Sequence, residues 1–485
     1  MKLTKIFSCL LLVGLLAACT ADFEEINTNR NAPTENNPAT LLPSIIFEPI
    51  NPHMTLQTWL SDQIMQYYVR RNDNQLDAYD FATGSGFFDA IWRANYAAIS
   101  NINDMNSAAV EQGLGAYEAA GKIFRAYYLA TNTELWIDIP ASEAGLGVEN
   151  SVPSYDAQST IYPNVLTLLE EANTLLANSD GFVIGGDVLF GGDVMKWRKL
   201  ANSLRLRYLL RLSNRAETNT ASEIAEIVND PDTYPIIASN EESGVYDFSG
   251  VSPNASSFSQ QAITTFSGLS MSKRMEGIFE GYDDPRVDYF FRFPENKDGF
   301  PNHEGVPNGL TREAAQSWNG NGDANTSLLT TRFVTNPGLL DYTIISYAEV
   351  EFILAEAALN GWTNGDAKAH YEAGITANFD QWGIDLPDGL LDDPAVAWDG
   401  TMERLMDQKW FAFLFNNTIE SWGEYKRTGL PALEIGPLAT TVTNGQFPTR
   451  VFYPTLEQSI NTTNYSAAAS SIGGDVITAK HWYQN

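Results

Sequence analysis

Apolar residues recur at helical spacing along several long segments of the chain. In each segment an apolar side chain returns every three or four positions, which places one face of an α-helix against a protein core. The segments with this pattern are residues 116–135, 161–178, 194–215, 347–359 and 367–382. The hydrophobic pattern therefore predicts a mostly α-helical fold.

The last two of these segments are joined by a short polar turn. Residues 360–366 contain two glycines and end on Asp366, a residue type that commonly caps a helix N-terminus. Two amphipathic helices joined this tightly form an antiparallel hairpin, which is the unit of tetratricopeptide arrays. The spacing does not recur at the roughly 34 residues of that repeat, so periodicity alone predicts helical hairpins and no particular array.

Two regions lack helical periodicity. Residues 232–268 and 283–340 are rich in Gly, Asn, Pro and Ser, so we expect irregular structure there. Loops this long within a compact domain usually carry function. No linker-like segment interrupts residues 40–485, which we therefore expect to form a single domain with long loop excursions.

The N-terminus has the pattern of an export signal. Lys2 and Lys5 precede an apolar run over residues 6–18 that is too short to cross a bilayer as a permanent helix. The run ends in Leu-Ala-Ala followed by Cys19, which resembles the lipobox of bacterial lipoproteins. We therefore expect residues 1–18 to be a lipoprotein signal peptide and Cys19 to become the acylated first residue of the mature chain. An ordinary secretory signal with a chance cysteine is the alternative.

The predicted cleavage changes the chemistry of the mature chain. The other cysteine, Cys9, lies in the discarded peptide, so no disulfide is expected. Loss of Lys2 and Lys5 changes the net charge from −31 to −33. Acyl chains on Cys19 would hold the protein on a membrane, with residues 19–39 as a flexible tether, because each buried methylene contributes about 0.8 kcal/mol.

An acidic stretch follows the predicted anchor. Residues 20–25 contain Asp22, Glu24 and Glu25, and acidic residues at this position resemble the surface-export signal of outer-membrane lipoproteins in some Gram-negative bacteria. A solvated linker without a sorting role is the alternative. The resemblance implies a lipid-anchored protein of the outer membrane, exposed at the cell surface.

The charge balance excludes some classes of partner. Lys and Arg total 29 against 60 Asp and Glu, so the net charge of −31 repels phosphate backbones and anionic lipids. We expect no nucleic-acid binding. Arg207, Arg211 and Arg215 recur at helical spacing, and in so acidic a chain we predict that this basic stripe pairs with the protein's own carboxylates.

Familiar catalytic and cofactor motifs are absent from the sequence. Its four histidines have no metal-ligand spacing, and no phosphate loop, calcium loop or nucleophile elbow occurs. We therefore expect no metal, no cofactor and no catalytic residue. The 60 carboxylates leave a glycosidase pair open, but no spacing selects one. Asp283, Asp284 and Arg286 are predicted to form a capped turn with a local ion pair.

Several further segments occur in a recognisable order. They include the lipobox with the residues after it, a Lys-Trp-Arg-Lys-Leu-Ala-Asn segment, an Asp-Pro-Arg turn, and helical segments containing Ala-Glu-Ala and Gln-Lys-Trp. Their positions are residues 19–29, 195–207, 284–286, 346–357, 408–410, 420–429 and 448–457. Together they resemble the SusD/RagB family of outer-membrane nutrient-binding lipoproteins, in particular its SusD-like branch, from Cys19 to Trp482.

The resemblance implies a mostly α-helical fold in which tetratricopeptide-like hairpins form a scaffold and irregular loops build a ligand face. It implies a protein that captures oligosaccharides or other nutrients. It also implies a partner, the TonB-dependent (SusC-like) outer-membrane transporter, over which such lipoproteins act as a hinged lid. The helical hairpins predicted from periodicity agree with this fold.

Aromatic residues are more numerous than a core of this size needs, with 11 Trp, 21 Tyr and 25 Phe. A sugar stacks its C–H face on such rings, while Asn and Arg hydrogen-bond its hydroxyls. The family's shared segments are chiefly structural, so we predict the ligand site from aromatic and polar residues on irregular segments. The candidates are Arg71, Asn72 and Tyr79 before the Gly84-Ser85-Gly86 turn, Phe300 and Trp318 in the second long loop, and Trp92. Trp318 is the strongest candidate. Trp92 could join the site, but core packing is the favoured alternative for it.

The leading interpretation is a binding module that delivers glycan to a transporter without covalent chemistry. A surface glycan hydrolase lipoprotein, which would share the anchor and the aromatic loops, is one alternative. A peptide-binding member of the same family is another, because aromatic loops and an acidic surface also suit cationic peptides.

Overall fold

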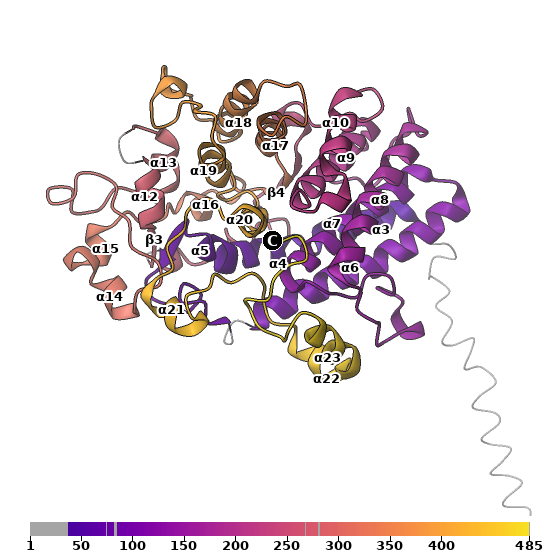
Figure 1. Cartoon of the computed structure of the whole chain (residues 1–485), viewed down its shortest axis with the longest axis horizontal. Helices are drawn as coiled ribbons and strands as arrows, with labels where there is room; N and C mark the ends of the chain where they lie inside the picture. Colours follow the sequence, from indigo (N-terminus) through magenta and orange to yellow (C-terminus); the bar gives the residue numbers. More distant parts are fainter. Residues whose placement is uncertain (1–36, 74, 82–84, 267, 280–281, 485) are drawn as a thin grey trace, which may run out of the picture. The chain divides into compact units, whose positions relative to one another are not determined.

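The computed structural model describes residues 37–73, 75–81, 85–266, 268–279 and 282–484. The predicted signal peptide, Cys19 and the acidic stretch lie outside the described residues, as does Gly84 of the predicted turn. Residues Pro38–Asn485 form one compact unit, most of it helical (Figure 1).

The first half of this unit is built from long helices that pack side by side in chain order (Figure 1). Its elements are α3 (Pro38–Phe47), α4 (Ile50–Leu56), the π-helical η1 (Gln57–Ser61), α5 (Asp62–Ile64), β1 (Tyr68–Arg70), α6 (Ser85–Gln112), α7 (Gly115–Trp136), η3 (Gly147–Glu149), α8 (Gln158–Ala177), α9 (Val194–Arg211), η4 (Ala216–Thr218) and α10 (Thr220–Asn229). The helices predicted over 116–135 and 161–178 are confirmed as α7 and α8. The helix predicted over 194–215 ends earlier, because the N–H of Leu212 closes a tight turn onto the carbonyl of Leu209 at 3.0 Å.

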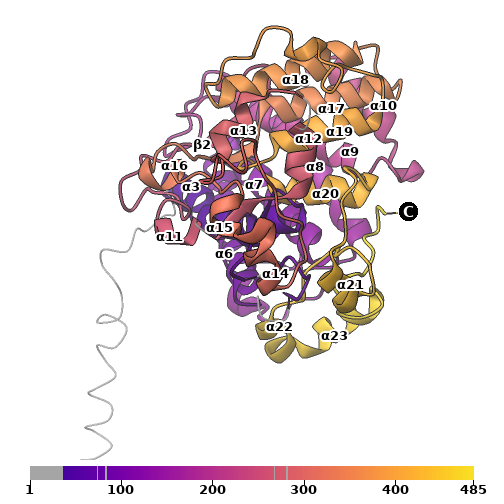
Figure 2. The same cartoon turned by 90° about the vertical axis from the view of Figure 1, so that its left-hand side faces the viewer.

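The last third of the chain is also helical, and α17, α18 and α19 lie together at the top of Figure 2. Its elements are α17 (Tyr347–Leu359), α18 (Ala367–Gln381), η7 (Leu390–Asp392), α19 (Met402–Ala412), α20 (Thr418–Thr428), α21 (Pro437–Thr443), α22 (Thr455–Ile460) and α23 (Thr462–Ser471). The predicted hairpin is confirmed, since α17 packs against α18. The side chain of Asp366 accepts hydrogen bonds from the N–H groups of Lys368 and Ala369 at 3.0 and 3.3 Å, as expected of an N-cap.

The region between α10 and α17 is irregular but contains short helices. Its elements are η5 (Asn240–Glu242), β2 (Gly244–Tyr246), α11 (Ile263–Phe266), β3 (Leu269–Met271), α12 (Lys273–Phe279), α13 (Pro285–Phe290), α14 (Arg312–Gln316), η6 (Trp318–Gly320), α15 (Gly322–Asn325), α16 (Arg332–Thr335) and β4 (Tyr342–Ile345). The prediction that residues 232–268 and 283–340 contain no helix is therefore wrong. These helices are too short for a hydrophobic period to reveal them.

Two small antiparallel sheets lie in this region, and one of them joins it to the segment that follows α5. Strand β1 pairs with β3, with Val69 opposite Ser270, and β2 pairs with β4, with Tyr246 opposite Tyr342. A further backbone contact continues the first pairing, since the N–H of Arg71 donates to the carbonyl of Gly268 at 2.8 Å. Residues just after β1 are thereby held beside the long loops.

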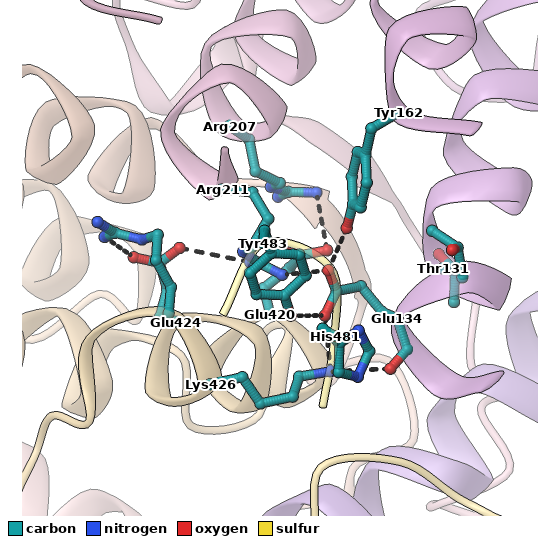
Figure 3. Close-up of polar contacts among 12 residues, drawn as sticks. Thr131, Glu134, Tyr162, Arg207, Arg211, Glu420, Glu424, Lys426, His481 and Tyr483 are labelled. Atoms are coloured by element: carbon teal, nitrogen blue, oxygen red, sulfur yellow. Dashed lines mark hydrogen bonds and ion pairs between the residues drawn. The ribbon is translucent and has the colours of Figure 1, made fainter. Parts of the chain in front are cut away.

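The basic stripe on α9 lies in the core and faces carboxylates (Figure 3). Arg207 donates through Nε and Nη2 to Glu349 at 2.5 and 2.6 Å. Arg211 lies 2.8 Å from Glu134 and 2.7 Å from Glu420. The prediction that these arginines pair with the protein's own carboxylates is confirmed for both. Arg215, which follows the end of α9, has an aromatic partner instead: its guanidinium lies over the ring of Trp482, 5.2 Å from the ring centroid.

Glu134 joins several parts of the chain in a buried cluster (Figure 3). Its carboxylate lies 2.6 Å from Lys426 and accepts a hydrogen bond from the hydroxyl of Tyr483 at 2.8 Å. Burial by itself would raise the pKa of Glu134, but Arg211 and Lys426 beside it hold that pKa below its usual range. This cluster fixes the C-terminal segment against α7.

The predicted turn at Asp284 is also confirmed. The Asp284 carboxylate caps α13 by accepting from the backbone N–H of Arg286 at 3.0 Å. The Arg286 side chain returns to the same carboxylate at 2.7 Å. Both side chains are buried, so this ion pair is part of the scaffold.

Candidate functional site

Trp318 lies half-buried on the short helical turn η6 within the long loop region. Its side chain packs against the small buried cluster of Val69, Val306 and Ala315. The indole Nε1 is itself buried and has no hydrogen-bond partner among the residues that the structure describes. The accessible part of the side chain is therefore ring carbon, the part that stacks on the C–H face of a sugar.

Arg71 holds the segment next to Trp318 in place. The Arg71 side chain is buried, and its Nε donates to Ser270 Oγ at 2.7 Å. Its Nη1 lies 2.6 Å from a carboxylate oxygen of Asp323, whose side chain is 76% exposed. The structure thus places Arg71 beneath the surface, where it ties α15 to the β1–β3 sheet.

Asn72 lies on the surface beside Trp318. Its Oδ1 accepts a hydrogen bond from Gln316 Nε2 at 3.0 Å, and Gln316 ends the helix that precedes Trp318. The structure therefore brings Asn72 and Trp318 together from positions far apart in the sequence. We call the group formed by Asn72, Gln316, Trp318, Asn319 and Asp323 the Trp318 surface.

The loop that carries Phe300 also contacts this region. The backbone N–H of Phe300 donates to the carbonyl of Asn296 at 2.9 Å, and the N–H of Asn296 donates to the carbonyl of Ala324 at 3.0 Å. Ala324 belongs to α15, so the Phe300 loop lies against the helix that Arg71 holds. The Phe300 side chain is half-buried.

A cavity of about 670 Å³ is lined in part by His303 and Glu304. The His303 ring stacks on Phe293 with centroids 4.2 Å apart and planes 22° apart. His303 is held from both sides, by Asp288 at 2.7 Å and by Ser327 Oγ at 2.9 Å. We call this hollow the His303 cavity, and its walls include the exposed ring of Phe293.

The His303 cavity adjoins the Trp318 surface. Asn319, the residue after Trp318, donates from Nδ2 to a carboxylate oxygen of Glu304 at 3.3 Å, and Glu304 lines the cavity. Sequence reasoning missed Phe293 and Asp288 as parts of a site. Phe293 satisfies the criterion that selected Phe300, an aromatic residue on an irregular segment, and could have been found in that way.

Tyr79 contacts a different part of the chain. It is buried and packs edge-on against Phe447, with ring centroids 5.5 Å apart. Burial raises the pKa of its hydroxyl. The structure thus places this candidate in a packing contact with the C-terminal region.

Trp92 is likewise in a packing position. It is buried on α6 between the rings of Tyr96 and Trp136, whose centroids lie 4.7 and 4.9 Å from its own. One edge lines a smaller cavity of about 230 Å³ together with Leu456. Core packing, the alternative considered for Trp92, accounts for most of its surface.

Comparison with known families identifies the fold. The chain matches the model of the SusD-like_2 family, described as starch-binding and associating with the outer membrane, over residues 30–454. The chain belongs to the SusD-like_2 family. No curated protein is significantly similar to the chain in sequence.

Solved structures show the same SusD-like architecture. A SusD homologue from Bacteroides fragilis superposes with a TM-score of 0.76 at 26% identity, covering 93% of this chain and 100% of its own. A chitin-binding protein superposes with a TM-score of 0.79 at 26% identity, and the match covers 92% of this chain and 100% of that protein. A chitin-binding SusD homologue from Flavobacterium johnsoniae, with a TM-score of 0.76 at 22% identity and coverage of 92% and 98%, shows the shared fold. The resemblance and the helical scaffold predicted from the sequence are therefore confirmed.

Two kinds of feature are absent from the described residues of this SusD-like chain. None of the described helices is long and apolar enough to cross a bilayer. Among the same residues, no group of three or more His, Cys, Asp and Glu side chains is placed to hold a metal ion.

The geometry of this SusD-like site suits recognition of a neutral polar ligand. The Trp318 ring offers an apolar surface, while Asn72 and Gln316 offer amide groups beside it. Such a pairing of a ring with flanking amides matches the alternating apolar faces and hydroxyl rims of a sugar.

Proposed function

We propose that this protein binds oligosaccharides at the Trp318 surface and the adjoining His303 cavity and passes them to a TonB-dependent (SusC-like) outer-membrane transporter. The observation that carries the proposal is the half-buried Trp318 ring, supported from behind by Val69, Val306 and Ala315. A ring held this way loses little conformational freedom when a sugar stacks on it. Membership of a family described as starch-binding supports the same ligand class.

The ligand class can be narrowed to starch-type or chitin-type oligosaccharides. The family description names starch, and one structural relative at 26% identity is named a chitin-binding protein. Both are neutral or nearly neutral glycans, which an acidic protein does not repel. Exposed amide groups at Asn72 and Gln316 would hydrogen-bond their hydroxyl or acetamido groups.

We infer that the protein binds without hydrolysing its ligand. Most carboxylates of the His303 cavity already have structural partners. Asp284 is bonded to Arg286, Asp288 to His303, and Glu276 to Lys273 at 2.7 Å. A glycosidase needs one carboxyl as a proton donor and a second as a nucleophile or base, and groups engaged in this way are poorly placed for either role.

We also propose that the protein is a surface-exposed lipoprotein of the outer membrane. In this proposal residues 1–18 are a signal peptide, Cys19 is acylated, residues 19–39 are a tether, and residues 40–485 form the binding domain. The family's association with the outer membrane supports this location. Acyl chains would then provide the membrane attachment.

Calorimetric titration with starch and chitin oligosaccharides tests the binding proposal. We expect binding without release of new reducing ends during prolonged incubation. Release of reducing ends would support the hydrolase alternative instead. Binding of basic peptides with no affinity for either glycan would support the peptide-binding alternative.

Membrane fractionation tests the anchor and the partner. We expect the wild-type protein to incorporate labelled fatty acid and to co-purify with a large β-barrel protein. The variant Cys19→Ser should incorporate no label and should appear in the soluble fraction. Unchanged labelling of Cys19→Ser would contradict the proposed anchor.

A further inference from the structure

A second large cavity has its own lining, although it borders the same short helix α13 as the His303 cavity. Its volume is about 680 Å³, and it opens between the start of α9, the β2–β4 sheet and the C-terminal end of α18, elements in the upper half of Figure 1. Its lining shares no residue with that of the His303 cavity. We call it the Trp382 cavity, after the largest side chain in its wall.

Two aromatic rings line the Trp382 cavity. Trp382 and Tyr289 are both half-buried, with ring centroids 5.8 Å apart and planes 50° apart. Phe290 packs perpendicular to Trp382 at 5.0 Å, and Arg332 covers one face of Tyr289 at 4.0 Å. The two rings are therefore fixed in place before any ligand arrives, which lowers the entropy cost of stacking.

Amide side chains beside the rings are also fixed. Gln381 donates from Nε2 to Asn416 Oδ1 at 2.6 Å, and Asn416 Nδ2 donates back to Gln381 Oε1 at 3.2 Å. The hydroxyl of Thr343 donates to the same Asn416 oxygen at 3.0 Å. Asn416 is buried and its amide is fully engaged, since Nδ2 also donates to the Ala412 carbonyl at 2.7 Å. The half-buried Gln381 keeps one N–H and one oxygen lone pair that a saccharide at the rings could use.

The cavity is strongly acidic. Its lining contains Glu241, Asp247, Asp341 and Asp380 but a single basic residue, Lys196. The ammonium of Lys196 donates to the backbone carbonyl of Glu241 at 2.8 Å. Among the described residues, these four carboxylates face the ammonium of Lys196 and the guanidinium of Arg332, which lies over Tyr289, so the cavity keeps a net negative charge that favours a cation.

Two further features strengthen the preference of the Trp382 cavity for a positively charged ligand. Burial and the neighbouring charge of Asp247 raise the pKa of Asp341 to about 6, although its carboxylate accepts a hydrogen bond from the backbone N–H of Phe248. Asp380 and Gln381 lie in the last turn of α18, where the helix dipole places partial negative charge. A positive charge on a ligand would relieve the repulsion between the carboxylates.

We propose that the Trp382 cavity binds a sugar ring that carries a protonated amine, such as a glucosamine unit. The ring of Trp382 stacks on its C–H face with Tyr289 beside it, and Asp341 and Asp380 pair with its ammonium group. A neutral N-acetylated ring lacks the charge that these carboxylates favour. This site is separate from the Trp318 surface and does not depend on the function proposed there.

Calorimetric titration of the full protein with two matched oligomers tests this proposal. One is a β-1,4-linked glucosamine oligomer and the other is the fully N-acetylated oligomer of equal length, both at neutral pH. The test variant is Asp341→Asn with Asp380→Asn, which removes charge and keeps shape. The control is Asp180→Asn, an exposed carboxylate outside the cavity lining.

We expect the double variant to bind the glucosamine oligomer about tenfold or more weakly than wild type, because charge-assisted contacts of about 1.4 kcal/mol or more are lost. Asp180→Asn should bind like wild type, and wild-type affinity should fall with added salt. Unchanged affinity in the double variant with an unchanged thermal midpoint would overturn the proposal. Binding of a lysine-rich peptide but not of the glucosamine oligomer would overturn the sugar assignment.

Discussion

The guanidinium of Arg207 and the carboxylate of Glu349 form a buried two-point ion pair, with nitrogen–oxygen distances of 2.5 and 2.6 Å. The two residues are 142 positions apart in the sequence. Arg207 lies on α9 and Glu349 in the first turn of α17, so the pair joins the first group of helices to the last across the irregular loop region. The irregular region that carries Trp318 and Tyr289 lies between these two residues along the chain.

Breaking this ion pair should destabilise the protein strongly. Glu349→Gln leaves the Arg207 charge buried with a weakened partner, so we expect the free energy of unfolding to fall by about 3–5 kcal/mol. Urea unfolding followed by circular dichroism measures this loss. The matched control is Glu171→Gln, which breaks the exposed Lys122–Glu171 pair and should cost at most about 1 kcal/mol. Equal losses in the two variants would contradict the role given to the Arg207–Glu349 pair.

The cap of α18 can be tested in the same assay. Asp366→Ala removes the acceptor for two backbone N–H groups, and we expect it to lower the free energy of unfolding by about 1 kcal/mol. Asp366→Asn keeps a good capping residue and should remain within a few tenths of wild type. An Asp366→Ala variant as stable as Asp366→Asn would show that the cap contributes nothing measurable.

Two tryptophans chosen from the same sequence argument should behave differently. Trp318→Ala should lower the affinity for the bound oligosaccharide about tenfold, because stacking on its ring is lost. Trp92→Ala removes a buried side chain and should instead lower the free energy of unfolding by about 3–5 kcal/mol. Calorimetry on both variants, together with their urea unfolding curves, separates the two effects. Unchanged glycan affinity in Trp318→Ala would remove this residue from the proposed site.

The buried carboxyl of Asp62 should make stability depend on pH. Burial raises its pKa in the folded protein to about 7, although the hydroxyl of Tyr68 donates to it at 2.8 Å. Between the unfolded pKa of about 4 and the folded value the folded state holds more protons, so stability falls as pH rises. Above about pH 7 the carboxyl is ionised in both states, so stability falls no further. The total loss of unfolding free energy is on the order of a few kcal/mol.

Asp62→Asn should remove this contribution. The difference in unfolding free energy between the variant and wild type should shift in favour of the variant as pH rises from about 4 to 7, and should be constant above that range. Urea unfolding of both proteins at a series of pH values measures this difference in unfolding free energy. A difference that does not change with pH would show that Asp62 titrates alike in the folded and unfolded chains.

Local features of the sequence determined much of the scaffold. The period of apolar residues over 347–359 and the capping chemistry of Asp366 placed the α17–α18 hairpin correctly, because both depend on neighbours within a few residues. The charge balance likewise predicted that the arginines of α9 pair inside the protein, since an acidic chain offers many carboxylates. Which carboxylates they meet was decided by folding, as the pairing of Arg207 with Glu349 shows.

The sites were decided by tertiary structure. The search for aromatic ligand contacts selected Trp318 and Trp92 alike. One is half-buried at the surface, and the other is packed among the rings of Tyr96 on α6, Trp136 on α7 and Tyr155 in a loop. Nothing in the sequence indicates that Asn72 meets Gln316, or that Tyr289, Asp341 and Trp382 share a cavity. Residue type and periodicity report only the local chain, whereas a binding site is made by side chains that long-range packing brings together.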